Sequence, residues 1–239
     1  MKAFRQIGWV VRKDLALQLR TKETLALIFV FSLLVVLIFS FAFGPIFPTE
    51  VEERGKLAAS VLWATFTFSG IITLNRSFDL ERANGALQGL KLTGMDAGNF
   101  YLAKVVSSVI FLAILGAIIT PITLQFLEIF DGLPLAVQVK LIPTLLKLVG
   151  VLTVGTLGFC AVGVTVSGMS TSTRGTESLL SVLLLPLVFP VIMGGARCTI
   201  SLLTKGIIGD NVHWFSILVV YSLVFLASSY LLFEFVIED

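Results

Sequence analysis

The sequence predicts an all-α integral membrane protein with six transmembrane helices, and its composition is the first observation that does so. Hydrophobic residues make up 56% of the 239 residues, and charged residues make up only 13%. Soluble globular proteins carry roughly 45–50% apolar and about 25% charged residues. A chain this poor in charge cannot cover a water-soluble domain with polar side chains. Most classes of soluble enzyme are therefore excluded.

Six uncharged stretches are the second observation, because each is long enough to cross a membrane. A helix needs about 20 mostly apolar residues to cross a hydrocarbon core of ~30 Å. The expected spans are about 26–43, 57–74, 105–127, 148–168, 178–196 and 214–233. They must be helices, because lipid offers the backbone no hydrogen-bond partner and the stretches do not alternate like barrel strands. The whole chain, 1–239, is then a single transmembrane domain.

Residues 1–24 predict an amphipathic helix that lies in the membrane interface before the first span. One face carries Phe4, Ile7, Val11, Leu15 and Leu19. The other face carries Lys2, Arg5, Trp9, Arg12, Lys13 and Arg20. Asp14 is the one polar residue on the apolar face. The alternative, which stays open, is a basic anchor that only fixes the topology.

The distribution of basic residues predicts that both termini lie in the cytoplasm. With six spans, 11 of the Lys and Arg residues fall on the side of the termini and 6 on the other side. Loops rich in Lys and Arg stay in the cytoplasm. The interfacial helix is therefore expected on the cytoplasmic surface.

The cytoplasmic loop 75–104, between the second and third spans, predicts a short helix at 79–92 that docks a partner. Apolar residues recur at helical spacing. Acidic residues in the first turn interact favourably with the positive N-terminal end of a helix, and Gly94 is typical of the position where a helix ends. The candidate docking residues are Asp79, Leu80, Glu81, Arg82, Ala83, Gly85, Leu87 and Leu90. The alternative is a solvated connector. Asp96 is a possible cap for the third span.

Pro186 and Pro190 make the fifth span the one that we expect to be short, broken or partly re-entrant. Each proline removes a backbone hydrogen bond and kinks a helix. Gly194 and Gly195 follow them. A re-entrant helix is therefore an open possibility for 178–213.

The chain carries no visible energy source of its own. Apart from the thiol of Cys160, the six uncharged stretches hold no ionisable side chain, whereas transporters driven by ion gradients usually bury such groups. The sequence also contains no GxxxxGK[ST] phosphate-binding loop. Active transport would therefore need work supplied by another chain. The alternative is a passive or structural membrane protein.

Catalytic, metal and nucleic-acid roles find no support in the sequence. No nucleophile–base set is visible, so we expect no enzyme activity. His213 is the only histidine, and the two cysteines have no metal-binding spacing. A net charge of +2 without a basic cluster on a soluble domain does not indicate a nucleic-acid partner.

Several motifs carry a family resemblance that covers nearly the whole chain. They are Arg12-Lys13-Asp14-Leu15, Phe78-x-x-Glu81-x-x-x-Gly85-Ala86-Leu87, Gly155-Thr156-Leu157 and the stretch from Glu177-Ser178-Leu179-Leu180 to Leu185-Pro186-Leu187-x-x-Pro190-Val191. With them the chain resembles the B-subunit (CcmB) family of the haem exporter of cytochrome c maturation. That family provides the permease of an ABC transporter of the ABC-2 type.

The resemblance implies a set of partners and a location. It implies an ABC ATPase on the cytoplasmic loop, a haem-handling (C-type) membrane subunit, a small membrane subunit, and a dimer or hetero-oligomer in the lipid bilayer. It also implies the bacterial inner (plasma) membrane and delivery of haem to c-type cytochromes outside the cytoplasm. Haem is then a transported or handled ligand, and no cofactor bound by this chain is expected.

His213 and Trp214 are the candidate haem contacts of this chain. Histidine is a common axial ligand of haem iron. The alternative is an interfacial aromatic belt, in which this pair only anchors the helix. Two other functions also stay open: a generic ABC-2 permease for a lipid, glycan or drug, and a non-transporting scaffold of the cytochrome c maturation complex.

Overall fold

The computed structural model describes residues 2–20, 22–43, 50–83, 95–127, 141–169 and 177–238, and within these ranges the chain is helical without a strand. The helices are α1 (Lys2–Arg20), α2 (Lys22–Phe43), α3 (Val51–Ala83), α5 (Ala97–Phe126), α7 (Leu141–Met169), α8 (Glu177–Lys205) and α9 (Val212–Glu238). A short 3-10 turn, η2 (Gly209–Asn211), precedes α9. The predicted all-α class is confirmed.

Within the described residues, six helices are long and apolar enough to cross a membrane, in agreement with the predicted number of spans. The spans are Leu25–Phe43, Glu52–Asp79, Ala97–Phe126, Pro143–Met169, Val182–Lys205 and Val212–Phe235. Most extend beyond the uncharged stretches of the sequence, so Lys104, Lys147 and Arg197 fall inside them. This corrects the expectation that Cys160 is the only ionisable residue in the spans. Charged heads are tolerated near helix ends when they find partners or reach the interface.

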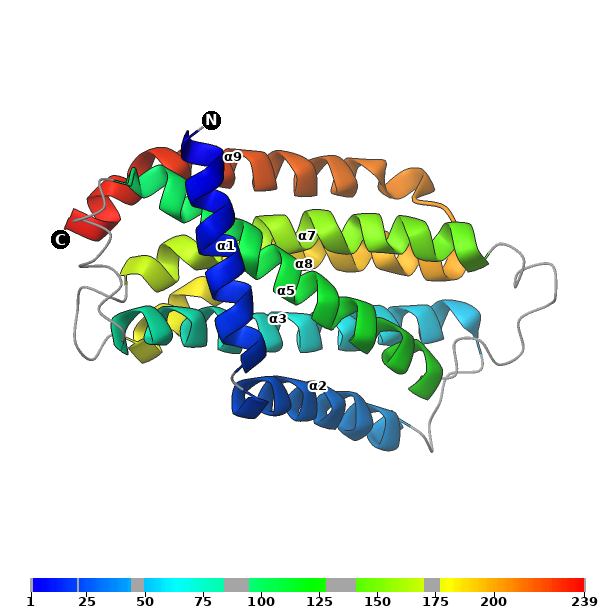
Figure 1. Ribbon diagram of the computed structural model, residues 1–239. Coiled ribbons are helices and arrows are strands. Elements are labelled where there is room, and N and C mark those ends of the chain that lie inside the picture. Colours follow the sequence, from blue (N-terminus) through cyan, green and yellow to red (C-terminus); the bar gives the residue numbers. More distant parts are fainter. Residues whose placement is uncertain are drawn as a thin grey trace.

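The bundle has α7 at its centre and two helices at its edges. Helix α7 packs against α3, α5, α8 and α9. Helices α2 and α9 lie at opposite edges, while α1 crosses α5 at a steep angle (Figure 1). We call the end where α3, α7 and α9 finish and α5 and α8 begin the proximal end. The opposite end, where α3, α7 and α9 begin, is the distal end.

The fifth span is a continuous helix, so the expectation of a broken or re-entrant segment is wrong. Helix α8 runs from Glu177 to Lys205 with Pro186 and Pro190 inside it. In membranes, neighbouring helices can supply partners to the backbone groups that a proline frees. Tyr221 of α9 donates its hydroxyl to the backbone oxygen of Leu187, which lies between the two prolines but is not the i−4 oxygen of either.

Trp63 of α3 is the largest fully buried side chain of the core, and two glycines make room for it. A Cβ atom on Gly195 of α8 would lie 2.0 Å from the Trp63 ring, and one on Gly155 of α7 would lie 2.4 Å from it. The indole nitrogen donates to the hydroxyl of Thr199 at 3.0 Å, so the ring is held in its place. Small residues allow this close approach of three helices.

We expect Gly155→Ala to destabilise the bundle because the new methyl group would overlap the Trp63 ring. Overpacking of this kind costs about 1–3 kcal/mol. The matched control is Gly150→Ala on the same helix, where no described atom lies within 4 Å of the added Cβ. Thermal unfolding in detergent should show a lower midpoint for Gly155→Ala only. Equal midpoints for the two variants would contradict the close packing of Trp63.

Candidate functional site

Helix α1 is confirmed as a helix, but its most buried side chains are polar. Asp14 and Gln18 are 3% and 6% exposed, whereas Phe4, Trp9 and Leu19 are 84%, 65% and 59% exposed. One helix face thus packs against the protein through a carboxylate and an amide. The exposed aromatic and apolar side chains remain available to lipid.

Four charged side chains from three helices form a closed ring at the proximal end. We call it the charged ring: Lys13 and Asp14 of α1, Glu81 of α3 and Lys104 of α5. Lys104 Nζ donates to Glu81 Oε1 at 2.6 Å and lies 2.9 Å from Asp14 Oδ2. Lys13 Nζ donates to the same Glu81 oxygen at 2.6 Å and lies 3.3 Å from Asp14 Oδ1. Positive and negative groups therefore alternate, and the ring is neutral.

Further polar and aromatic side chains complete the surroundings of Lys104. Its ammonium donates to Ser77 Oγ at 3.4 Å and lies 5.6 Å from the ring centroid of Phe78 and 5.7 Å from that of Phe100. Ser107 donates to Asp14 Oδ2 at 3.2 Å. The Lys104 side chain is only 1% exposed, so these contacts replace water almost entirely.

The pKa values of two ring members shift in opposite directions. Burial opposes the charged form of Lys13, but its hydrogen bond to Glu81 and the charges of Asp14 and Glu81 outweigh burial and raise the pKa of Lys13. Burial likewise opposes ionised Glu81, but Lys104 and Lys13 outweigh it and lower the pKa of Glu81. Both groups are therefore charged at neutral pH, which keeps their attraction intact.

The charged ring holds α1 against α3 and α5, and breaking its ion pairs would cost considerable free energy. Removing one partner of a buried ion pair leaves an uncompensated charge and costs about 3–5 kcal/mol. The contacts of Asp14, Glu81 and Lys104 are the buried ones, while Lys13 stands at the rim with its side chain 43% exposed. A displacement of the end of α3 must therefore carry α1 and α5 with it or break the ring.

The predicted docking residues are distributed differently from the expectation. Helix α3 continues to Ala83, so the expectation of a separate helix that starts at Asp79 is wrong. Asp79 is exposed, whereas Glu81 is 3% exposed and points into the charged ring rather than toward a partner. Leu80, Arg82 and Ala83 lie in the last turns of α3, and their side chains are outside the described part. The residues Gly85, Leu87 and Leu90 lie outside the described residues.

Two other predicted features are placed as follows. Asp96 caps α5, because its Oδ1 accepts from the backbone nitrogens of Gly98 at 2.7 Å and Asn99 at 3.4 Å. Among the interfacial residues, Arg5, Trp9 and Arg12 are exposed on α1. The predicted cap is thus confirmed.

The pair His213 and Trp214 lies at the distal end, at the start of α9. His213 is exposed and its ring centroid lies 5.4 Å from that of Trp214. Arg197 of α8 lies over the half-buried Trp214 ring at 6.0 Å. In the part of the chain that the structure describes, no group of three or more His, Cys, Asp and Glu side chains is placed to hold a metal ion.

Comparison with known proteins identifies the family of this fold. The family model described as CcmB protein matches residues 5–236. The chain belongs to the CcmB family. A relative in Haemophilus influenzae, named heme exporter protein B, is 24% identical over 184 residues, which cover 77% of this chain and 76% of the relative. The matched range includes all four members of the charged ring in this CcmB-family protein.

The sequence analysis does not predict the ring, because it places Lys13 on the basic face of the first helix and assigns Glu81 to partner docking. Asp14 is polar on an otherwise apolar face, and Gln18 one turn later lies on the same face, so the expectation that Asp14 is the one polar residue there is wrong. Glu81 and Lys104 lie in a loop by hydropathy, because the uncharged stretches stop at 74 and resume at 105. Glu81 pairs with Lys13 of α1, 68 positions away, and with Lys104 of α5, 23 positions away, and no local sequence pattern connects these residues.

We expect Lys104→Met to destabilise the protein strongly, because Asp14 and Glu81 would share only the rim cation Lys13. The expected loss is about 3–5 kcal/mol, measured as the free energy of unfolding in detergent. Adding Glu81→Leu to Lys104→Met should recover part of it, since one positive and one negative charge then remain. The control Lys56→Met removes two exposed ion pairs, with Glu52 and Glu53, and should leave the stability nearly unchanged. Equal effects of Lys104→Met and Lys56→Met would refute the energetic role of the ring.

The lowered pKa of Glu81 predicts a loss of stability in acid. A carboxyl group with a lower pKa in the folded state stabilises that state at every pH above its unfolded value. This contribution fades as the pH falls from about 4.3, the ordinary glutamate value, through the lower folded value. The free energy of unfolding, measured between neutral pH and pH ~3, should therefore decrease more with falling pH for wild type than for Glu81→Gln. Parallel curves would contradict a stabilising Glu81 carboxylate.

Proposed function

We propose that this chain is the permease subunit of a haem export complex in c-type cytochrome biogenesis, driven by a separate ATPase chain. Membership of the CcmB family and the name of the Haemophilus influenzae relative support haem export. The six spans support a permease. The sequence lacks a phosphate-binding loop, which supports a motor on another chain.

The ATPase would dock on the cytoplasmic loop 75–104, and within this segment on the residues that follow the end of α3, among them Gly85, Leu87 and Leu90. Because Glu81 lies two residues before Ala83, a push on this segment acts next to the charged ring. The ring would pass the displacement to α1 and α5, so that three helices move together. Such a rigid shift between two states is a known way to open and close a membrane pathway.

An external energy source also agrees with the charge state of the ring. A group that exchanges protons with an ion gradient needs a pKa near the working pH. Lys13 and Glu81 shift the other way, away from neutrality. These two groups are therefore poor candidates for proton exchange near neutral pH.

The remaining assignments follow from the same proposal. Both termini lie in the cytoplasm, which places the proximal end and α1 at the cytoplasmic surface of the bacterial inner membrane. Haem is the handled ligand, and His213 and Trp214 at the distal end are its candidate contacts in this chain. A haem-handling membrane subunit, a small membrane subunit and a second permease copy complete the complex.

We expect Gly85→Pro and Leu87→Asp to abolish recovery of the ATPase with the membrane complex, because both substitutions lie in the proposed docking segment. The control is Val212→Asp, at an exposed position of the distal end. Affinity purification of the tagged permease, followed by quantification of the ATPase, measures the effect. Undiminished recovery with both docking variants would count against this docking site.

A second experiment separates the candidate substrates. A strain that lacks this chain should lose its c-type cytochromes on a haem-stained gel, and the wild-type gene should restore them. Intact cytochromes would indicate a permease for a lipid, glycan or drug instead. If the cytochromes need this chain but survive an ATPase-dead partner, the chain is a scaffold and not a transporter.

A further inference from the structure

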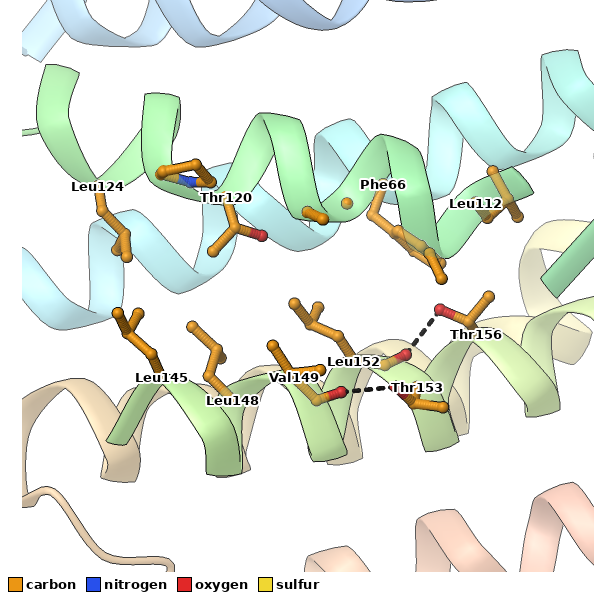
Figure 2. Close-up of a pocket in the computed structure, with 14 residues that line it drawn as sticks. Phe66, Leu112, Thr120, Leu124, Leu145, Leu148, Val149, Leu152, Thr153 and Thr156 are labelled. Atoms are coloured by element: carbon orange, nitrogen blue, oxygen red, sulfur yellow. Dashed lines mark hydrogen bonds between the residues drawn. The ribbon is translucent and has the colours of Figure 1, made fainter. Parts of the chain in front are cut away.

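An apolar groove runs between α5 and α7 in the distal half of the bundle. Its volume is about 290 Å³, and Phe66 of α3 closes its floor. The described residues that line it are almost all aliphatic or small, and Figure 2 shows side chains from the two helices facing each other across the space. The floor is buried, with Phe66, Leu112 and Leu148 at most 7% exposed.

The groove opens sideways, toward the hydrocarbon of the bilayer. Ala113, Ala117 and Pro121 on α5 and Val149 and Thr153 on α7 are exposed at its rim. These helices cross the membrane at this level, so the solvent at the rim is lipid and not water. An apolar groove in contact with lipid chains is filled by something apolar.

Thr120 adds a polar group to this wall. Its side chain is 6% exposed, and its hydroxyl has no hydrogen-bond partner in the described part of the chain. Figure 2 shows it directed from α5 into the space above α7. By contrast, the hydroxyls of Thr153 and Thr156 donate to Val149 O and Leu152 O of their own helix. An unpaired buried hydroxyl is costly, so the groove lacks one hydrogen-bond acceptor.

We propose that this groove binds one acyl chain of an ester-linked phospholipid from the distal leaflet. The ester carbonyl oxygen of this lipid accepts a hydrogen bond from the Thr120 hydroxyl. The lining from Leu112 to Leu124 covers about 18 Å along α5 at the helical rise of ~1.5 Å per residue. One leaflet contributes about 15 Å of hydrocarbon. The groove therefore has the length of a single chain that runs along the membrane normal.

The dimensions and chemistry of the groove disfavour the other occupants. A helix segment 18 Å long and about 10 Å wide occupies roughly 1,400 Å³, several times the volume of the groove. Haem iron requires His, Met, Cys or Tyr, and none of the described lining residues is of these types. Water would meet hydrocarbon side chains on nearly every side and few polar partners.

Gly116 provides a way to fill the groove by mutation. No described atom lies within 4 Å of a Cβ placed there, so Gly116→Phe has room for its side chain where the lipid chain would lie. Ile114→Phe is the matched control, because Ile114 is 52% exposed on the same helix and does not line the groove. Thr120→Val keeps the shape of the wall and removes only the donor.

Native mass spectrometry of the full chain, released from vesicles of phosphatidylethanolamine and phosphatidylglycerol, tests the proposal. Wild type and Ile114→Phe should each retain one phospholipid, and Gly116→Phe should retain none. Thr120→Val should retain it with an affinity lower by roughly 2- to 12-fold, the value of one neutral hydrogen bond. Equal retention by wild type and Gly116→Phe, or no retained lipid in wild type, would overturn the proposal.

Photolabelling in the membrane locates the chain independently. Phosphatidylethanolamine with a diazirine in its acyl chain should label peptides of α5 and α7 that line the groove, and Gly116→Phe should suppress that label alone. Even labelling of all lipid-facing helices would show only the surrounding bilayer and contradict the site. A cross-link from the groove to a companion protein in native membranes would assign it to a helix contact instead and equally contradict the lipid.

Discussion

The neutral ring of two lysines and two carboxylates is the interaction on which the proximal half of this molecule depends. The side chains of Asp14, Glu81 and Lys104 are almost completely buried, and each forms an ion pair with an opposite charge on another helix. A buried charge without its partner is far less stable than one that stays in water. The ring therefore determines where α1 can lie, because only one placement brings Asp14 and Lys13 to the other two charges.

The two halves of the bundle are held by different physical means. At the proximal end, paired charges define the positions of α1, α3 and α5. Further along, Trp63 packs against glycine backbones, and its contacts are short-range and sensitive to shape. Beyond it, α5 and α7 separate along the apolar groove. The groove therefore leaves space between α5 and α7 beside the tightly packed Trp63.

This division matches the proposed direction of work. A force applied beside the end of α3 would enter through the rigid half, where the charged ring resists separation of the helices. The groove between α5 and α7 would offer space for the rearrangement that follows. A lipid chain in the groove would fill the space in one state and would have to leave or shift in another, so the membrane itself would take part in the equilibrium between the two states.

Hydropathy alone determined the class of this protein, the number of spans and the helical nature of α1, because each depends only on composition or on local periodicity. The cap at Asp96 was equally local. Three features needed the tertiary structure: the continuity of α8 through its prolines, the extension of α3 to Ala83, and the pairing of Glu81 with Lys13 and Lys104. The reason is physical, since a buried charge is tolerated only when a distant segment supplies the partner. Residues that are distant in the sequence come into contact only when the helices pack, so the sequence order alone does not show which of them are partners.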